Sequence, residues 1–289
     1  MKKEVDDVRH EDFSMTHKLK FNHIISTFRK TSIYTDYNRD KMSDFSSQNP
    51  YGMEEKLAYL EKIQLKLEAA RNVHQKVEIK FCGQNFVIYP NVFNPSIFVG
   101  TEFFVEELIK VVTEYQPDKP KVLEIGTGAG YISILAVLNG ASTVTCTDIN
   151  RDALKNAEEN INKYGVQDRI TLKYSDVFDA LNVNEKFDII VWNFPFGHIN
   201  KSVDELEILE RALMDPFYKS LDRYFKTANE YLNKDRGRLF IGFSFSAGDE
   251  HAFKEIAEKY KWTIHLRNEI KSDTIPAMHM GLYELIKAE

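Results

Sequence analysis

Residues 122–134 read VLEIGTGAGYISI, and they constrain the fold more than any other stretch of the chain. An apolar strand pattern runs into three glycines at alternate positions, Gly126, Gly128 and Gly130, and a helical pattern follows at once. Strand, glycine turn and helix together bring backbone N–H groups and a helix N-terminus against a ligand. Glycine allows that close approach and the backbone angles it needs. A tight turn without a ligand is the plain structural alternative.

The chain after residue 121 alternates short apolar strands with amphipathic helices. Such alternation predicts a doubly wound α/β domain, with a mostly parallel sheet covered on both faces. Ligands in such sheets bind outside the carboxyl ends of the strands, so functional residues are expected just after strands. The expected strands are 121–125, 143–148, 170–174, 187–192, 238–243, 262–266 and 280–286, and the expected helices are 102–115, 151–164, 204–233 with a break at Pro216, and 250–260.

The first part of the chain is more polar and is expected to form a separate region. Residues 1–75 are expected to be a helical appendage on the substrate side, and residues 76–289 the ligand-binding domain, with a β-hairpin and linker at 76–100. Basic and aromatic residues are interleaved between residues 13 and 43. This pattern favours a helical arm packed by its aromatics over a substrate lid or a nucleic-acid contact.

Composition narrows the class of protein. The 289 residues are 43% hydrophobic and 28% charged, with a net charge of −6 and a pI of about 5.8. These values fit a globular enzyme, and nucleic acid stays a possible partner that the acidic balance does not favour. Two cysteines, Cys82 and Cys146, supply neither a disulfide framework nor a metal cluster and indicate a reducing cytoplasm. We find no signal peptide and no run of membrane-spanning length, so no membrane partner is expected.

Asp148 ends the second strand of the sheet pattern, eighteen residues after Gly130. A carboxylate at this place can accept hydrogen bonds from both hydroxyls of a ribose. Its alternative role is to cap the helix that begins near residue 151, but Asn150 is better placed to do so. We therefore predict that Asp148 binds a ribose and that Ile149 packs on the attached base.

Asp176 and Val177 follow the third strand, 170–174. The carboxylate of Asp176 can accept a hydrogen bond from an adenine amino group, and the Val177 N–H can donate to a ring nitrogen. Asp179 could fill the acceptor role equally well, and a turn aspartate without a ligand is the structural alternative.

The fourth strand ends in Asn193-Phe194-Pro195-Phe196. A short loop stiffened by proline can hold the Asn193 carboxamide oxygen and the Phe194 carbonyl as two fixed acceptors. They can grip a planar amino or amide nitrogen and stabilise the positive charge that develops on it. Phe196 can stack on a planar substrate. An ordinary proline loop would explain this stretch alone, but its position after the glycine turn and Asp148 favours a site.

The chain resembles class I S-adenosylmethionine (SAM) dependent N-methyltransferases whose fourth motif is [D/N]-P-P-[Y/F]. The features that carry this resemblance are, in sequence order, the E-x-G-x-G-x-G turn, Asp148, Asp176 and Asn193-Phe-Pro-Phe. These enzymes include adenine-N6 methyltransferases and the glutamine-N5 methyltransferases of peptide release factors, the HemK/PrmC family. The hairpin, Val92-Phe-Asn-Pro95 and Thr101-Glu102 are similar to the corresponding segments of the latter family. The resemblance covers roughly residues 77–245.

The resemblance implies a Rossmann-like methyltransferase fold with a seven-stranded sheet and SAM as the cofactor. It also implies direct displacement at the SAM methyl by the held nitrogen, which needs no strong base. The expected catalytic residues are Asn193, Phe194, Pro195 and Phe196, and the expected cofactor-binding residues are Thr101, Glu124, Gly126, Thr127, Gly128, Gly130, Asp148, Ile149, Asp176, Val177 and Asn193. No metal site is expected.

Several positions depart from the family pattern. Phe194 replaces the first proline of the fourth motif, Phe196 replaces its tyrosine, and no arginine lies between Pro95 and Thr101. Residues 198–214 look like a substrate-side insertion, in which His198 could be a base or a substrate contact, although a loop histidine is more often incidental.

The acceptor class stays open between a small molecule, a protein glutamine and an RNA adenine. The alternatives to an enzyme of this kind are a non-catalytic SAM-binding or scaffold subunit and a nicotinamide oxidoreductase. A scaffold subunit is disfavoured because the glycines, Asp148 and Asn193 are retained. An oxidoreductase is disfavoured because its G-x-G-x-x-G spacing is absent at this turn.

Overall fold

The computed structural model describes residues 53–98, 100–272 and 278–288. The chain separates into two compact units, residues 1–49 and 50–289, and all the described residues belong to the second unit. The basic and aromatic arm predicted between residues 13 and 43 lies outside the described residues. The expected domain boundary at residue 75 stays a prediction.

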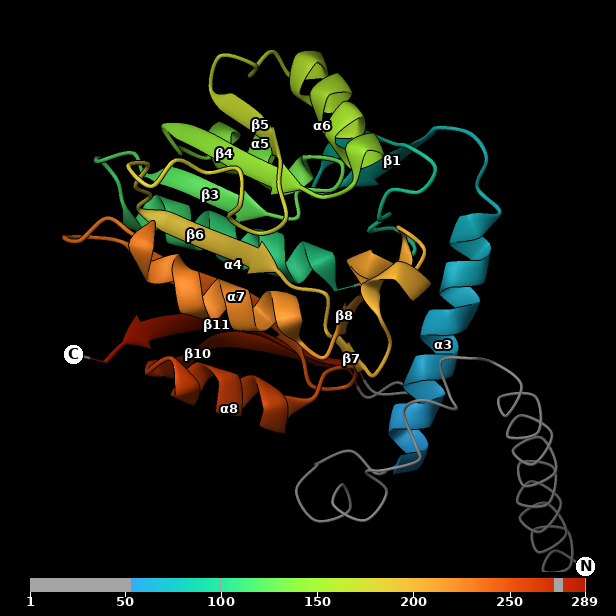
Figure 1. Ribbon diagram of the computed structural model, residues 1–289. Helices are drawn as coiled ribbons and strands as arrows, with labels where there is room; N and C mark the ends of the chain where they lie inside the picture. Colours follow the sequence, from blue (N-terminus) through green and yellow to red (C-terminus); the bar gives the residue numbers. More distant parts are fainter. Residues whose placement is uncertain (1–52, 99, 273–277, 289) are drawn as a thin grey trace, which may run out of the picture. The chain divides into compact units, whose positions relative to one another are not determined.

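A seven-stranded sheet forms the centre of the described unit, in the order β10-β11-β9-β6-β3-β4-β5 (Figure 1). Its strands are β3 Lys121–Ile125, β4 Thr143–Asp148, β5 Ile170–Tyr174, β6 Ile189–Asn193, β9 Arg238–Ser244, β10 Trp262–Ser272 and β11 Met278–Lys287. Neighbouring strands from β9 to β5 are parallel, and β11 runs antiparallel to both β9 and β10. The predicted mostly parallel, doubly wound sheet is confirmed.

Helices cover both faces of the sheet because its central strands are apolar on both sides. The helices are α4 Thr101–Glu114, α5 Tyr131–Leu138, α6 Arg151–Lys163, α7 Lys219–Thr227 and α8 Glu250–Lys259. In β3, Val122 packs into the core formed with α4, α5 and α6, and the next residue, Leu123, packs into the core formed with α7 and α8. The strands β6 and β9 alternate in the same way.

The direction in which successive strands are added to the sheet reverses once, next to β3, and ligands in such sheets bind at this kind of switch point. The chain passes from β3 to β4 to β5 in one direction and then returns to β6 on the other side of β3. Connections leave in opposite directions at this point, so a crevice opens between the carboxyl ends of β3 and β6. The glycine turn follows β3, and Asn193 ends β6.

The hairpin of β1 Val77–Phe81 and β2 Gln84–Ile88 is fastened to α6. Two asparagines of that helix bind its backbone: Asn160 accepts from the Val87 N–H at 2.9 Å, and Asn156 accepts from the Tyr89 N–H at 2.8 Å. Both carboxamides also donate to the Val87 carbonyl. The linker after the hairpin therefore leaves from a fixed point beside the glycine turn.

The predicted helix over residues 204–216 is wrong. This segment forms two short 3-10 turns, η1 Val203–Glu205 and η2 Glu210–Ala212, and the strand β8 Met214–Pro216, which pairs with β7 Gly197–Ile199. The carboxylate of Asp215 accepts hydrogen bonds from the N–H groups of Ser220 and Leu221 at 3.1 and 3.0 Å, so the helix begins only after Pro216. We call residues 197–216 the insertion.

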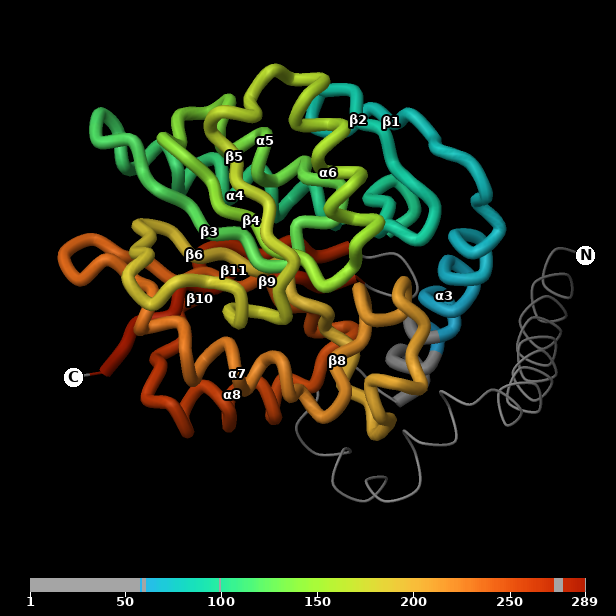
Figure 2. The backbone as a smooth tube through the Cα atoms, turned by 45° about the horizontal axis from the view of Figure 1, so that its top comes forward, coloured from blue at the N-terminus to red at the C-terminus, as the bar shows by residue number. Residues whose placement is uncertain are grey.

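The helix α3, Met53–Arg71, which falls in the helical region expected over residues 1–75, lies beside the insertion (Figures 1 and 2). Leu67 and Ala70 pack against Phe98 and Leu209, and the last residue of the helix, Arg71, binds Glu207 at 2.7 Å and Glu210 at 2.9 Å. We call α3 and the insertion together the cover. Neither α3 nor any other described helix has the length and apolar character needed to cross a bilayer.

Candidate functional site

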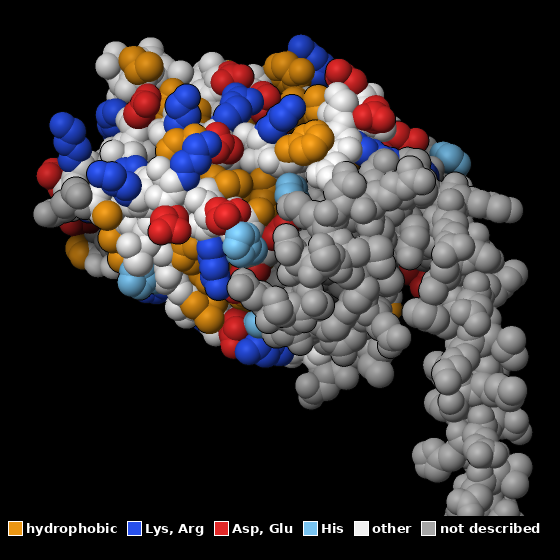
Figure 3. Space-filling model, turned by 60° about the horizontal axis from the view of Figure 1, so that its bottom comes forward, with side chains coloured by type: hydrophobic (Ala, Val, Ile, Leu, Met, Phe, Trp, Pro, Cys, Tyr) orange, Lys and Arg blue, Asp and Glu red, His pale blue; other side chains and the backbone are white. Residues whose placement is uncertain are grey.

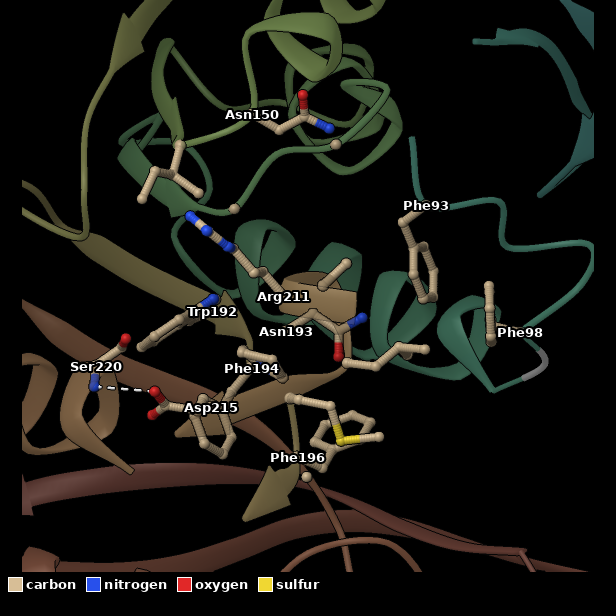
Figure 4. Close-up of a pocket in the computed structure, with 18 of the residues that line it drawn as sticks. Phe93, Phe98, Asn150, Trp192, Asn193, Phe194, Phe196, Arg211, Asp215 and Ser220 are labelled. Carbon is tan, nitrogen blue, oxygen red and sulfur yellow. Dashed lines mark hydrogen bonds between the residues drawn. The ribbon is translucent and has the colours of Figure 1, made fainter. Parts of the chain in front are cut away.

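A cavity of about 240 Å³ opens at the carboxyl ends of β3, β4, β5 and β6, between the sheet and the cover (Figure 4). Most of the predicted site residues line it: Thr101, Gly126, Gly128, Asp148, Ile149, Asp176, Val177, Asn193, Phe194, Pro195 and Phe196. Glu124, Thr127 and Gly130 do not belong to the lining. Residues from five separate segments of the sequence thus meet at the switch point of the sheet.

The glycines of the turn have two different structural roles. All three have positive φ, between 56° and 80°, which residues with a Cβ rarely adopt. A Cβ on Gly128 would meet nothing within 4 Å, so this glycine faces the open cavity. A Cβ on Gly130 would lie 3.0 Å from the Cβ of Ala157, so this glycine lets the turn pack on α6.

Asp148 is held by the backbone around it. Its Oδ2 accepts a hydrogen bond from the Gly128 N–H at 2.8 Å, and its Oδ1 accepts from the Asn150 N–H at 2.8 Å. The side chain of Asn150 caps α6 by accepting from the Asp152 N–H at 2.9 Å, so Asp148 is not the cap. Burial raises the pKa of Asp148 to about 6.

Glu124 lies beneath the glycine turn, 1% exposed. Its Oε2 accepts hydrogen bonds from the hydroxyls of Thr127, at 2.9 Å, and of Ser133, whereas its Oε1 has no partner in the described part of the chain. Burial raises the pKa of Glu124 to about 8, although both hydroxyls act against the shift. Glu124 and Thr127 therefore support the turn from below, with Ser133 as a partner that sequence reasoning missed.

Of the two carboxylates considered for an adenine amino group, only Asp176 lines the cavity. Arg223 of α7 binds both, at 2.6 Å from Asp176 Oδ2 and 2.6 Å from Asp179 Oδ1. Val177, the next residue, has a left-handed φ of 51°. Sequence reasoning missed Arg223 because it lies 47 residues from Asp176.

Asn193 stands in the middle of the cavity wall, between Trp192 and Phe194 on one side and Phe93 and Phe98 on the other (Figure 4). Its carboxamide Oδ1 is buried and has no hydrogen-bond partner among the described residues. A buried acceptor without a partner costs about 1–3 kcal/mol, which a ligand that donates to it would recover. This oxygen is thus an unused acceptor on a residue that lines the cavity.

The residues after Asn193 differ in their roles. Phe194 is 1% exposed, and its ring packs edge-on against Trp192 and Tyr218, both at 5.2 Å between centroids. Its side chain therefore belongs to the core, and only its backbone is available to a ligand. Phe196 is half-buried, and its carbonyl accepts a hydrogen bond from the Tyr218 hydroxyl at 2.6 Å.

His198 does not line the cavity. Its Nδ1 lies 3.0 Å from Asp249 Oδ2, and its ring lies against that of Tyr218 at 4.5 Å between centroids. The structure thus places His198 behind the Asn193–Phe196 loop, where it supports Tyr218.

Sequence reasoning placed residues 1–75 and 198–214 on the substrate side, but it did not single out the individual side chains that line the cavity there. The additional lining residues include Phe93 and Phe98 from the linker, Met278 and Met280 from β11, Lys62 and Lys66 from α3, and Arg211 from the insertion. None of them carries a motif, because each reaches the site only through the folding of distant segments.

The sequence matches one protein-family description, "Methyltransferase small domain", over residues 83–264. The chain belongs to the methyltransferase small domain family. This membership confirms the predicted resemblance, and the match contains the glycine turn, Asp148 and Asn193. Residues 53–71, which form α3, precede the match.

Several curated relatives are named "Release factor glutamine methyltransferase", among them one from Fusobacterium nucleatum and one from Streptococcus pneumoniae. The one from Fusobacterium nucleatum is 36% identical over 187 residues, covering 58% of this chain and 48% of the relative. The one from Streptococcus pneumoniae is 30% identical over 216 residues, covering 71% of this chain and 73% of the relative. The match thus spans about half of the first relative and nearly three quarters of the second.

Among solved structures, the methyltransferase SMU.776 complexed with S-adenosylhomocysteine (SAH) shares the fold, with a TM-score of 0.54. Its sequence is 15% identical, and the likeness covers 73% of this chain and 56% of that one.

Proposed function

We propose that the protein is a SAM-dependent N-methyltransferase that transfers a methyl group to an amino or amide nitrogen. The observation that carries this proposal is the buried, unpartnered Oδ1 of Asn193 at the end of β6. It lies in the same cavity as the glycine turn after β3 and Asp148 after β4. Family membership supports the reaction class, and the SAH bound in SMU.776 supports the cofactor.

The cofactor would lie across the carboxyl ends of β3, β4 and β5. Each oxygen of Asp148 accepts one backbone N–H and keeps lone pairs for the two ribose hydroxyls. Ile149 and Val177 would pack against the adenine, and Asp176 would accept from its amino group while Arg223 fixes the carboxylate. Gly126 and Gly128 would leave room for the methionine part.

The acceptor nitrogen would be held by Asn193 Oδ1 and the Phe194 carbonyl. Two acceptors in fixed positions orient the N–H bonds and direct the nitrogen lone pair at the methyl carbon. Bound SAM would supply the methyl group, with the S–C bond breaking as the N–C bond forms and its electrons staying on sulfur. The Asn193 and Phe194 oxygens would stabilise the positive charge that develops on the nitrogen, and the proton would then leave to water.

The names of the relatives favour an amide or amine acceptor over an RNA base. On the face shown in Figure 3, Lys and Arg side chains are interspersed with Asp and Glu, without a patch of one sign that would suit a phosphate backbone. The sequence's only two cysteines, Cys82 and Cys146, are free, which suits the cytoplasm as the working compartment.

A thermal-shift comparison of SAM, SAH and NAD tests the cofactor directly. A ligand that binds only the native state raises the melting temperature by mass action. We expect SAM and SAH to stabilise the protein and Asp148→Ala to lose most of that shift while keeping its far-ultraviolet circular dichroism. Stabilisation by NAD alone would sink the proposal, and SAM binding without SAH formation on any acceptor would favour the non-catalytic subunit.

A further inference from the structure

Three positively charged side chains line the substrate side of the cavity. Lys62 and Lys66 lie one turn apart on α3, and Arg211 lies in η2 of the insertion. Arg211 is held by a hydrogen bond from its Nε to the Leu206 carbonyl at 3.3 Å. Within the described ranges of the chain, no ion pair includes any of these three side chains.

The acidic side chains of the same cavity do not neutralise them. Asp148 is bound by backbone N–H groups, and Asp176 is bound by Arg223. Asp215 accepts from two backbone N–H groups at the start of α7. Burial and the charge of Lys62 lower the pKa of Lys66, which agrees with two close ammonium groups that lack a counter-ion.

An aromatic wall adjoins the positive charges. The rings of Phe93 and Phe98 stack at 4.9 Å between centroids, and the Lys66 ammonium lies 5.9 Å from the centroid of Phe98. This wall faces Asn193 across the cavity (Figure 4). The cavity thus combines an amide acceptor, an apolar wall and a cationic edge.

We infer that the methyl acceptor is a small molecule that carries an anionic group, a carboxylate or a phosphate, in addition to its reactive nitrogen. Lys62 and Lys66 bind the anionic group, the phenylalanines contact the body of the molecule, and Asn193 holds the nitrogen. Oxyanions are the groups that clustered lysine and arginine side chains bind best. The inference rests on the proposed function, since it assumes that the cofactor occupies the other side of the cavity.

The test uses the full-length protein saturated with SAH, with benzoate, phenyl phosphate and benzamide as probes. Benzoate and benzamide have nearly the same shape but differ in charge. We expect the two anions, and not benzamide, to raise the melting temperature, and their ranking shows which anion fits. Lys62→Ala and Lys66→Ala should each weaken anion binding roughly ten- to hundredfold, the effect of one lost charge-assisted hydrogen bond. Lys234→Ala, at an exposed lysine outside the cavity, is the matched control.

Three results would overturn the inference: equal stabilisation by benzamide, no stabilisation by either anion, or equal binding by Lys66→Ala and Lys234→Ala. A loss of SAH affinity in the cavity variants would also overturn it, because the cations would then serve the carboxylate of the cofactor. Failure of the unmodified protein to bind SAH would refute the proposed function instead, so the two failures are distinguishable.

Discussion

The Oδ1 atom of Asn193 lies 3.0 Å from the point at which a Cβ on Gly242 would stand. The two residues are register partners on β6 and β9, and Phe104 closes the other side at 2.9 Å from the same point. Gly242 is therefore the residue that gives the carboxamide its room. Because no described group donates to this oxygen, steric fit alone fixes its position before the substrate arrives.

Replacing Asn193 should lower the rate of methyl transfer without weakening the binding of SAM. We expect Asn193→Ala to lower turnover by about 10²–10³-fold, the usual effect of losing one preorganised group that stabilises transition-state charge. The dissociation constant for SAM should change little, because other residues bind the cofactor. Initial rates of SAH formation and calorimetric titration with SAM measure the two quantities. Asn193→Asp, which keeps an acceptor, should retain more activity, and unchanged turnover in Asn193→Ala would remove this residue from its role.

Alanine substitutions at Gly130 and Gly128 should affect different properties, the first mainly stability and the second mainly SAM binding. Gly130→Ala adds a Cβ that meets Ala157 at 3.0 Å in a strained backbone, so we expect a loss of about 1–3 kcal/mol in the free energy of unfolding. Gly128→Ala has the same kind of backbone strain, but the new methyl group would stand in open space in the cavity. We therefore expect this substitution to weaken SAM binding more than it lowers the free energy of unfolding. Urea unfolding and SAM titration of both variants check this contrast. If the two variants had equal stability and lost the same SAM affinity, the expected difference between them would be contradicted.

The affinity for SAM should fall in mild acid. Ribose hydroxyls donate to the ionised carboxylate of Asp148, so binding requires the deprotonated form. With a pKa of about 6, the ionised fraction falls about tenfold per pH unit below that value. The dissociation constant should therefore rise between pH 6 and pH 4.5, and in Asp148→Asn binding should be weaker and nearly independent of pH. A flat profile in the unmodified protein would argue against a ribose contact.

The stability of the ligand-free protein should decrease as the pH rises towards 8. Burial raises the pKa of Glu124 from 4.5 to about 8, so between these values the folded state binds more protons than the unfolded state. The slope of the unfolding free energy with pH is then negative, about 1.4 kcal/mol per unit for one proton. Glu124→Gln removes this proton and should flatten the slope in urea unfolding measured from pH 5 to 8. An equal slope in both proteins would contradict the assignment.

The sheet, and the meeting of the glycine turn, Asp148 and Asn193 in one cavity, could be predicted because their signals are local. These three features stand at the ends of strands, and parallel strands bring their carboxyl ends to one edge. The segments of the substrate side could be predicted, but their individual contacts could not, since these contacts join segments far apart. Arg71 reaches Glu207 across 136 residues. The prediction for segment 204–216 was wrong because its apolar residues suggest a helix, whereas they pack in small clusters with α3 and the linker.

Within the cover, the Arg71 ion pairs join α3 to the insertion, and the hydrophobic cluster around Leu67 packs both of them against Phe98 of the linker. Helix α3 precedes the segment that matches the family, and yet it supplies Lys62 and Lys66 to the cavity. The residues proposed to bind the methyl donor thus lie inside the segment that matches the family, whereas part of the proposed acceptor wall lies outside it. We expect substitutions in α3 to change the binding of the acceptor without altering any residue that is proposed to hold the donor.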